Sequence, residues 1–564
     1  MEQQVRTVDP VTQEIIQGKL LSMVDEMGIV MARTSMSPVI YEVLDFACGI
    51  CTRDCDLIAQ TNGITLFTGT FATQVRSLVE RFADDMAPGD VLVTNDPYSG
   101  GTHSCDLAIM RPIFAEGRII AFAINVAHWL DVGGAVPGSL PPDANSVFQE
   151  GLRLPCVRIA RDDKLLPDMV RIISENVRLP EVALGDLNAQ LATVRIAERR
   201  ILEMVEKYGA GTIQDAFDHL LDVSERRSKD VIAALPDGLY EATDVIDGDG
   251  ITTDPIEVKV AIRIEGGRME VDFTGCPPAA AGPINCARGA LSSAVKTIFK
   301  ALVAPQEPSN EGWFRPLSVI APDGTVFTAQ KPSPTGWYYE GSVHASELVW
   351  KALAPLMPER FSAGSYSSLC VTYINGRTAD GEEFIHIEPQ HGGWGGAPGR
   401  DGASAVIALT DGDTYNYSVE LIEAKFPLHV RRYALNVEGG AGAGQWRGGF
   451  GVVREYEILS GEADIHSGFG RSRTPPWGMD GGDAGSLNRL DVVDNEAGNT
   501  TSYGRLSHRR VVKGDVLRIA TGGGGGWGDA AKRSNDAIAE DIRAGYISAE
   551  HAASEYNHRG MATK

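Results

Sequence analysis

The residues best suited to chemistry stand close together in a polar stretch, 94–106, in the N-terminal third of the chain. Pro97 and Gly100 predict that this stretch is a loop, because proline and glycine favour the backbone angles of tight turns. The loop carries His103 and Asp106, two residue types whose side chains bind divalent metal ions. The loop is therefore the first candidate for a functional site.

Two apolar runs follow this loop and predict a β-hairpin. They are Leu107 to Phe114 and Arg118 to Ala127, separated by a short turn that ends in glycine. We expect Phe114 to pair with Arg118 across that turn. Because the two strands would be antiparallel neighbours, the residues at their outer ends would lie near each other.

This register predicts that three polar side chains meet at the open end of the hairpin. His128, which directly follows the second run, would face Ser104, and Asp106 would lie two residues further along on the same face. His103 would lie one position beyond Ser104. The prediction is sensitive to register, because a slip by one residue turns every side chain of a strand to the other face.

Two histidines and one carboxylate form a suitable site for a divalent metal ion. Imidazole and carboxylate suit Mn, Fe, Zn or Ni, and we expect zinc or manganese. Three protein ligands leave positions open for water or substrate, as in catalytic sites, where the ion polarises a carbonyl or lowers the pKa of bound water. The alternative is that His103, Asp106 and His128 make ordinary hydrogen bonds, because short motifs of this kind also occur by chance.

Three further carboxylates are candidates for catalysis beside such a site. Asp131 follows His128 by three residues and could orient a ligand or act as a base. Glu150 and Asp45 could also act as the base, and the sequence does not decide between the three. The alternatives are a buried structural ion pair for Glu150 and a place at a strand edge or turn for Asp45.

The elements that must position these residues indicate an α+β protein of 564 residues. A helix begins at Asp9-Pro10, with aspartate as the N-cap and proline at the first helical position. A second amphipathic helix spans about Phe71 to Phe82, and a long helical stretch from Val194 to Leu235 ends at Pro236-Asp237-Gly238. That turn is the expected domain boundary.

Beyond the boundary, alternating apolar residues and glycine-rich turns predict a β-rich region. Glycine accounts for 63 residues of the chain, and we expect its C-terminal clusters, at 439–451, 478–485 and 522–526, to lie at turns and possible bulges. A short helix follows. The expected divisions are an N-terminal α/β region with the hairpin and metal site at 1–236, a β-rich region at 237–530 and a helical tail at 531–564.

Charge and cysteine content argue against several classes of protein. With 51 basic and 75 acidic residues, the net charge of −24 disfavours binding to nucleic acids or anionic membranes. Met1 to Val5 has no signal-peptide pattern, and the longest mostly apolar stretch, Ile119 to Leu130, is too short to span a bilayer. The eight cysteines therefore predict free thiols, and we expect a cytoplasmic protein. The sequence contains no phosphate-binding Gly-x-x-x-x-Gly-Lys-Ser/Thr loop.

A series of longer motifs extends over nearly the whole chain. The motifs are Asn95-Asp96-Pro97-Tyr98-x-Gly-Gly-Thr-His-x-x-Asp106, His128-x-x-Asp131-x-Gly-Gly, Pro137-Gly138-Ser139, Gln149-Glu150-Gly151-Leu152-Arg153-x-Pro155, Gly185-Asp186-Leu187-Asn188-Ala189-Gln190, Gly282-Pro283-Ile284-Asn285-Cys286, Arg447-Gly448-Gly449-x-Gly451, Pro475-Pro476-Trp477-Gly478 and the closing run Gly522 to Asp529. In this number and order they resemble the hydantoinase B/oxoprolinase family.

The resemblance implies the B-type subunit of an ATP-dependent amidohydrolase for a cyclic amide, such as a hydantoin, a lactam or 5-oxoproline. An A-type partner would bind ATP and phosphorylate the carbonyl oxygen, and the B-type subunit would complete the hydrolysis with a metal-activated water. In the related acetone carboxylase, the metal ligands correspond to His103, Asp106 and His128. Family analogy favours a heterotetramer of two A-type and two B-type subunits.

Two other functions stay open on the sequence alone. The chain could be a subunit of an ATP-dependent ketone carboxylase, because acetone and acetophenone carboxylases are larger relatives in the family. It could also be a non-catalytic scaffold, with all the chemistry in the A-type subunit. The length of the chain fits the hydrolase subunits better than the longer carboxylase subunits.

Overall fold

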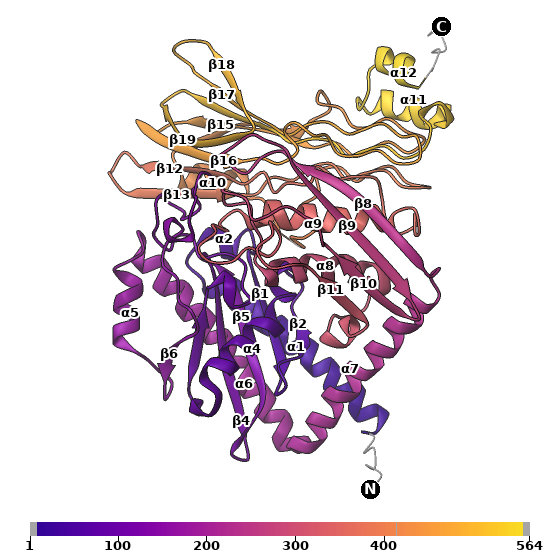
Figure 1. The fold of residues 1–564 in the computed structure, drawn as a ribbon. Coiled ribbons are helices and arrows are strands. Elements are labelled where there is room, and N and C mark those ends of the chain that lie inside the picture. The colour runs from indigo at the N-terminus through magenta and orange to yellow at the C-terminus, as the bar shows by residue number, and fades with distance from the viewer. Residues whose placement is uncertain (1–7, 413, 557–564) are drawn as a thin grey trace. The chain divides into compact units, whose positions relative to one another are not determined.

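The computed structural model describes residues 8–412 and 414–556, and shows an α+β protein whose described part contains four β-sheets (Figure 1). Two predictions fall partly or wholly outside these residues. They are the absence of a signal-peptide pattern at Met1 to Val5 and the last part of the helical tail predicted at 531–564. The chain divides into two compact units. Unit 1 takes the chain up to residue 241 together with 260–338 and 410–415, and unit 2 takes 242–259, 339–409 and the chain from 416 onward.

Unit 1 is built on an antiparallel sheet of seven strands in the order β2-β1-β5-β4-β3-β6-β7. The strands are β1 (Phe46–Thr52), β2 (Leu57–Gln60), β3 (Val91–Thr94), β4 (Asp106–Ala115), β5 (Arg118–His128), β6 (Val157–Arg161) and β7 (Lys164–Leu165). The predicted hairpin is β4 and β5, which occupy the centre of this sheet. Every residue of β1 and the inner parts of β4 and β5 are buried, as expected for strands covered on both faces.

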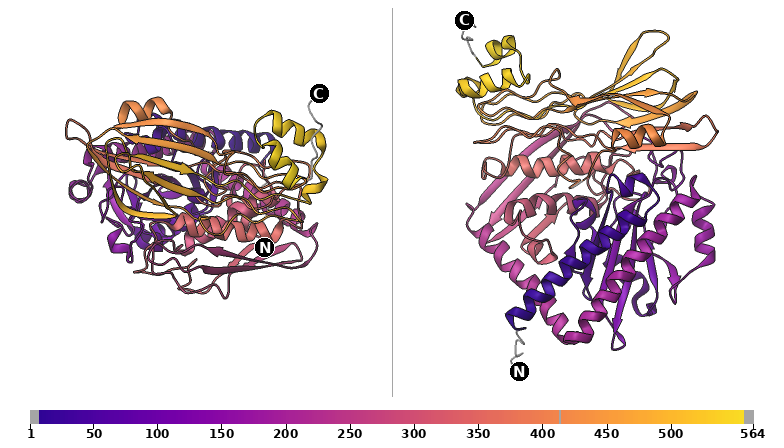
Figure 2. Two further views of the ribbon diagram at one scale, coloured as in Figure 1. Left: turned by 90° about the horizontal axis from the view of Figure 1, so that it is seen from above. Right: turned by 180° about the vertical axis from the view of Figure 1, so that it is seen from behind.

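Helices cover both faces of this sheet. The α1 helix (Pro10–Thr34) packs beside α6 (Pro180–Tyr208), and α4 (Phe71–Phe82) lies on the other face (Figures 1 and 2). Alternation along β1 explains this arrangement, because Phe46 approaches Gly28 of α1 whereas the Gly49 backbone lies against the ring of Phe71. Asp9 caps α1 as predicted, with its carboxylate accepting bonds from two backbone N–H groups.

The remaining helices of unit 1 lie around this core. They are α2 (Pro38–Tyr41), α3 (Thr65–Thr68), α5 (Pro167–Ser174), α7 (Ala210–Ala233) and α8 (Arg288–Val303), with short 3-10 turns η1 (Ala83–Asp85), η2 (Pro97–Ser99), η3 (Val147–Gln149) and η4 (Glu311–Phe314). The long helical stretch was predicted to begin at Val194, but α6 begins at Pro180. The stretch is interrupted at Gly209, which has a φ of 82°, and α7 begins at the next residue.

The other sheets and helices form the rest of the described chain. A four-stranded sheet of order β11-β10-β9-β8 contains β8 (Gly238–Ile246), β9 (Ile256–Glu265), β10 (Arg268–Asp272) and β11 (Leu317–Ile320). Two sheets belong to unit 2, β13-β12-β16-β19 and β14-β15-β20-β17-β18. Their strands are β12 (Thr372–Arg377), β13 (Glu383–Glu388), β14 (Leu428–Leu435), β15 (Val452–Ile458), β16 (Glu462–Gly468), β17 (Arg489–Val493), β18 (Thr500–Tyr503), β19 (Arg505–Val512) and β20 (Val516–Ala520). The helices are α9 (Tyr338–Leu353), α10 (Val419–Lys425), η5 (Ala530–Lys532), α11 (Asn535–Arg543) and α12 (Ala549–Glu555), so the tail has two helices where one was predicted.

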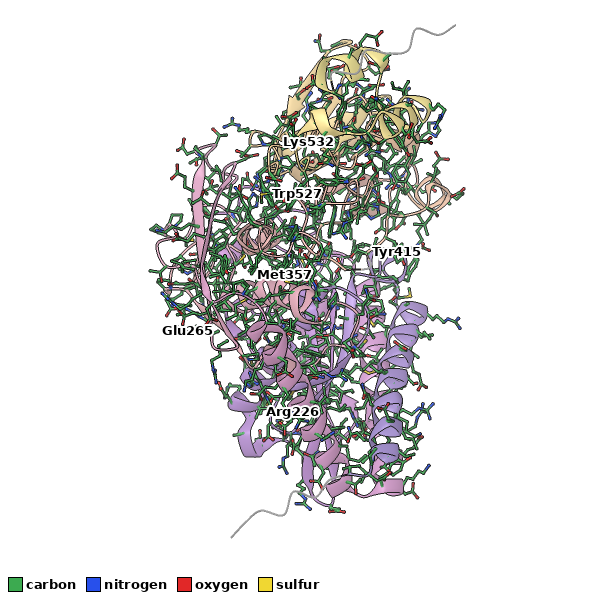
Figure 3. All side chains as sticks on the ribbon, turned by 90° about the vertical axis from the view of Figure 1, so that its right-hand side faces the viewer. Arg226, Glu265, Met357, Tyr415, Trp527 and Lys532 are labelled. Carbon is green, nitrogen blue, oxygen red and sulfur yellow. The ribbon has the colours of Figure 1, made fainter. Side chains whose placement is uncertain are left out.

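The glycine run 522–526 is extended and lies at the centre of a group of backbone segments in unit 2. Its carbonyl oxygens accept backbone hydrogen bonds of 2.8–2.9 Å from Gly393, Gly442 and Gly396. Trp527, which follows the run (Figure 3), exchanges backbone bonds of 2.8 and 3.0 Å with Trp446. The run therefore binds several different segments rather than one neighbouring strand.

For the run 522–526 this packing corrects the expectation of turns and bulges, whereas Gly439 and Gly481 of the other two clusters do lie in turns. None of the glycines 522–526 has a positive φ, so no left-handed turn requires them. Each is needed for close approach instead, because a Cβ on Gly524 would lie 2.2 Å from the backbone of Trp394 and one on Gly526 would lie 2.0 Å from the Ala443 oxygen. Glycine allows such contacts because it has no side chain.

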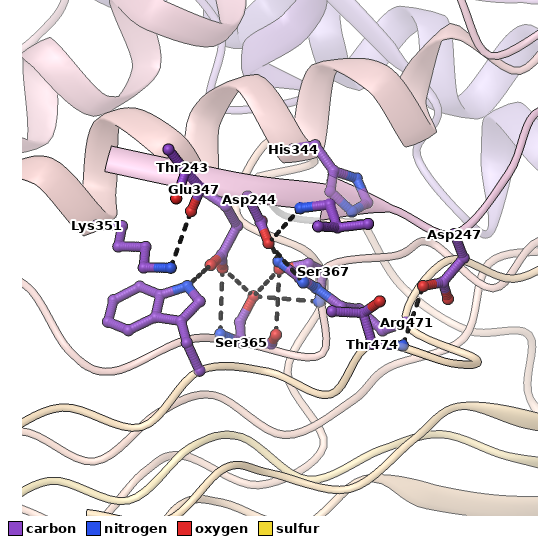
Figure 4. Close-up of polar contacts among 12 residues, drawn as sticks. Thr243, Asp244, Asp247, His344, Glu347, Lys351, Ser365, Ser367, Arg471 and Thr474 are labelled. Carbon is purple, nitrogen blue, oxygen red and sulfur yellow. Dashed lines mark hydrogen bonds and ion pairs between the residues drawn. The ribbon is translucent and has the colours of Figure 1, made fainter. Parts of the chain in front are cut away.

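Unit 2 also contains a buried polar network (Figure 4). The carboxylate of Asp244 binds the guanidinium of Arg471, which is 1% exposed, through both of its oxygens. Nearby, Glu347 accepts bonds from the backbone and hydroxyl of Ser365 and, at 2.8 Å, from the indole of Trp477. These bonds satisfy charged groups that would otherwise be costly to bury.

A Gly524→Ala substitution should lower the free energy of unfolding by about 1–3 kcal/mol or more, because its Cβ would overlap the Trp394 backbone. Urea or thermal denaturation measures the effect. Gly461→Ala is the matched control, because a Cβ at Gly461 has no atom within 4 Å and its φ is not in the left-handed region. Equal stability of the two variants would show that close backbone packing does not constrain the glycine run.

Candidate metal centre

The open end of the β4–β5 hairpin holds the predicted ligand residues, but in a different register from the predicted one. Asp106, not Ser104, pairs with His128. The turn has two residues, so Ala115 pairs with Arg118, and a bulge near Ile113 shifts the ladder once more. The two shifts together move the pairing by two residues, which keeps every side chain on its expected face.

Three side-chain atoms converge at this end of the hairpin. His103 Nε2 lies 2.9 Å from Asp106 Oδ1 and 3.1 Å from His128 Nδ1, and His128 Nδ1 lies 3.0 Å from Asp106 Oδ1. The three side chains are buried, with 1–5% exposure. One ion can therefore contact all three atoms.

The hydrogen bonds around this triad suit a cation. His103 Nδ1 lies 2.7 Å from the carbonyl oxygen of Gly336, which can only accept, so Nδ1 carries a proton and Nε2 is the ring nitrogen left to bind a metal ion. Burial alone would raise the pKa of Asp106, but charge and hydrogen bonds from the His103 and His128 rings hold it well below its usual range. An ionised carboxylate and two imidazole nitrogens thus face the same point, a donor set that fits a divalent transition metal.

Glu150 contacts the triad indirectly, through the backbone of Gly336. Its carboxylate accepts bonds from the backbone N–H groups of Thr335, at 2.9 and 3.1 Å, and of Gly336, at 2.7 Å. Burial raises its pKa to about 7, against these backbone hydrogen bonds. Glu150 therefore fixes the peptide whose carbonyl orients His103.

Asp131 uses its carboxylate to stabilise the loop that follows β5. Its two oxygens accept bonds of 2.9–3.0 Å from the backbone of Gly133, Gly138 and Arg178, and from the Arg178 guanidinium. These bonds close the loop that follows β5 and join it to the segment before α6. No atom of the triad is among its partners.

Asp45 lies directly beside the triad. Its backbone oxygen accepts a 3.0 Å bond from the N–H of His128. Burial raises the pKa of its carboxyl group to about 8, with His128 opposing and Asp106 adding to the shift. Within the described part of the chain, no hydrogen bond to its carboxylate is recorded, in contrast to Asp131 and Glu150.

Two further residues at this place were not among the sequence-predicted ones. The ring of Tyr338 meets that of His103 edge-on, with 5.0 Å between ring centroids. Asp411, in a segment more than 280 residues after His128, is close enough to Asp106 that repulsion, after burial, raises its pKa to about 7. No local sequence signal marks either residue, because both reach the site only through the fold.

Comparison with known proteins places this fold and site. The fold is α+β, and the described residues contain one candidate metal centre, made of two buried histidines and a buried carboxylate. The family model described as Hydantoinase B/oxoprolinase matches residues 9–530. The chain belongs to this family, and the resemblance stated from its motifs is confirmed.

Three relatives give the family more detail. A protein of Pseudomonas sp. (strain NS671), assigned as the B-type subunit of a D-/L-hydantoinase, is 31% identical over 98% of this chain and 95% of its own length. The crystal structure of the ATP-dependent caprolactamase from Pseudomonas jessenii matches with a TM-score of 0.92 and 26% identity, over 99% of this chain and 97% of the other. A nucleotide-free acetone carboxylase structure matches with a TM-score of 0.91 over 99% of this chain and 81% of the other, and at 18% identity it shows a shared fold alone.

Two other predictions concern the whole chain. None of the eight cysteines forms a disulfide, as predicted, and all eight are buried. Within the residues that the structure describes, no helix is long and apolar enough to cross a membrane.

His103→Ala should abolish tight binding of one divalent ion per chain, because it removes a ligand from a buried three-ligand set. Metal analysis of the purified chain and titration with Zn²⁺ or Mn²⁺ measure the effect. The matched control is His219→Ala, which changes an exposed histidine of α7. Unchanged metal content in His103→Ala would contradict the assignment of the centre.

Glu150→Gln should weaken metal binding by about 10–100-fold, the usual effect of losing a group that orients a ligand. The amide keeps one acceptor oxygen but turns an N–H₂ group toward the backbone donors of Thr335 and Gly336. Titration of the metal-free variant measures this change, with the stability of the apo-protein as a check on folding. Wild-type affinity in this variant would mean that the Gly336 carbonyl does not need Glu150.

Proposed function

We propose that this chain is the B-type subunit of an ATP-dependent cyclic amide hydrolase, acting on a hydantoin, a lactam or a 5-oxoproline-like ring. The observation that supports this most is the buried His103, Asp106 and His128 triad in a chain of the Hydantoinase B/oxoprolinase family. Relatives over the full length of the chain carry hydantoinase and caprolactamase names. A binding-only scaffold would not need three converging ligand atoms in its interior.

The triad would hold a divalent transition metal, zinc or manganese. His103 would bind through Nε2, because its Nδ1 donates to Gly336. When bound there, such an ion polarises a carbonyl group or lowers the pKa of a water molecule. Asp106 supplies the negative charge that offsets part of the charge of the ion.

We assign the role of general base to Asp45 in preference to Asp131 and Glu150. A base must offer a lone pair that is free to take a proton. Asp131 and Glu150 already accept several backbone hydrogen bonds each, and a proton on either would break them. Asp45 has no recorded bond of this kind in the described chain, and its pKa, raised to about 8, lies near the operating range of a base.

The partner in this proposal is an A-type subunit that binds ATP and phosphorylates the amide oxygen. Phosphorylation makes a poor electrophile reactive, and the B-type subunit then directs the attack of water while excluding bulk solvent. The hydantoinase relative is named as one subunit of its enzyme, which supports the need for a partner. A heterotetramer of two subunits of each type and a cytoplasmic location complete the proposal.

Co-expression with an A-type subunit tests the proposal directly. The complex should hydrolyse ATP in the presence of at least one member of a panel of hydantoin, 5-oxoproline and ε-caprolactam, and should release the ring-opened product without bicarbonate. The chain alone should be inactive, because an unactivated amide is a poor electrophile. The Asp45→Ala complex should lose catalytic activity to a greater extent than the matched surface variant Asp143→Ala.

Three outcomes would contradict the proposal. Bicarbonate-dependent ATP hydrolysis with acetone would favour the ketone carboxylase function instead. Activity of a His103→Ala complex equal to the wild type would favour the scaffold function. Rapid hydrolysis of a lactam by the chain alone, without ATP, would rule out the need for an A-type partner.

A further inference from the structure

The segment 410–415 is distant in sequence from the metal ligands. It forms hydrogen bonds with residues that come before those ligands in the chain. The carbonyl oxygen of Thr410 accepts bonds from the hydroxyl of Thr65, at 2.6 Å, and from the backbone of Leu66, at 3.3 Å. At the other end, the N–H of Tyr415 (Figure 3) donates to Val43 at 3.1 Å. The segment is therefore fixed at both ends to unit 1, and Asp411 lies between these two attachments.

Close packing restricts the described residues that follow Asp411. Gly412 has a φ of 62°, and a Cβ at this position would lie 2.2 Å from the backbone oxygen of Gly63. The hydroxyl of Thr414 donates a 2.8 Å bond to the carbonyl of Asp411. The side chain of Asp411 is thus presented from a backbone whose position is determined by several contacts.

Asp411 itself is 5% exposed, and its carboxyl group has no recorded hydrogen bond to any described residue. Its oxygens are not among the fully buried side-chain atoms that have no partner, so they keep some contact with water. The groups that interact with it electrostatically are Asp106, Asp45 and Tyr338, and none of these has a positive charge. With no protein donor among the described residues, this carboxyl group is open to a donor that a bound molecule would bring in place of water.

The chemistry of a cyclic amide supplies such a donor. In a secondary ring amide the N–H nitrogen is bonded directly to the carbonyl carbon. Protein groups that recognise the N–H and the carbonyl must therefore be neighbours in the site. The triad gathers three ligand atoms, and Asp411 is close enough to interact electrostatically with Asp106 and Asp45. A carboxyl group can accept a bond from N–H when ionised or donate one to an unprotonated nitrogen when protonated.

We propose that Asp411 is the residue that recognises the ring nitrogen of the substrate and so selects secondary cyclic amides over ketones and N-alkylated rings. This inference rests on the proposed function and deepens it. A ketone offers no N–H group, and a methyl group on nitrogen would face a buried carboxyl group with no hydrogen bond to replace the lost one. Rejection by an unsatisfied buried polar group is strong compared with rejection by shape alone.

The experiment compares ring amides with their N-methyl analogues in the complex with the A-type subunit. The pairs are ε-caprolactam with N-methylcaprolactam and 2-pyrrolidone with N-methyl-2-pyrrolidone, alongside hydantoin and 5-oxoproline. The wild type should favour the N–H member of each hydrolysed pair by about tenfold or more in kcat/KM. Asp411→Ala should raise KM for the N–H member and reduce this preference to near unity, and Asp411→Asn, which keeps an acceptor oxygen, should retain part of it.

Metal content and thermal stability provide readouts that do not depend on activity. Asp411→Ala should bind one equivalent of Zn²⁺ or Mn²⁺ with the affinity of the wild type, because the triad stays intact. Asp380→Ala, at an exposed aspartate in the turn between β12 and β13, is the matched control and should keep the substrate preference.

The outcomes separate this inference from the proposed function. If the wild-type complex hydrolyses a ring amide but Asp411→Ala keeps the full preference for N–H, the inference is wrong and the proposed function stands. Loss of the metal in Asp411→Ala would also overturn it, because Asp411 would then act on the ion. If the wild-type complex hydrolyses no member of the panel, the proposed function fails, and the inference fails with it.

Discussion

The pairing of Asp106 with His128 across β4 and β5 is the interaction on which the candidate centre depends. It places a carboxylate of 1% exposure between two imidazole rings, at distances near 3 Å. Burial without these rings would favour the neutral acid, and their presence keeps the group ionised. The pairing is itself fixed by the sheet, because any slip by one residue would turn the apolar faces of both strands away from the helices that cover them.

Segments far from the hairpin in sequence complete the site. Gly336 orients His103 and is in turn held by Glu150, whereas Asp411 lies on a segment attached to the first turn of α3. Each contact uses a backbone group or a buried carboxylate, so the ligand positions are determined by the packing of unit 1 as a whole. The loop glycines contribute in the same way, because Gly134 at a φ of 88° passes within contact distance of the Gln149 backbone.

Local patterns in the sequence predict the hairpin, most of its bounds and the three ligand residues. Apolar runs of the right length and a turn that ends in Gly117 are local properties, and the ligands stand directly at the ends of those runs. The predicted turn was one residue too long, and the bulge near Ile113, which has no local signature, adds a second shift. The predicted pairing was therefore wrong by two residues, although the facing was right. The positions of Gly336 and Asp411 could not be predicted, because tertiary packing alone brings them near His103 and Asp106. The same limit explains the glycine run 522–526, whose neighbours come from several distant segments.

The energetic cost of this site bears on its purpose. Three carboxyl groups lie close together here, Asp106 and Asp411 buried and Asp45 half-buried, and the pKa values of Asp45 and Asp411 are raised by loss of solvent and by repulsion. A core selected for stability alone would replace such groups by apolar side chains, which is often neutral or stabilising. Unit 2 shows the alternative, because its buried Asp244 is neutralised by the two-pronged contact with Arg471. The carboxyl groups beside the triad have no such cation among the described residues, so a bound cation and a hydrogen-bond donor from a ligand are the groups that would balance them.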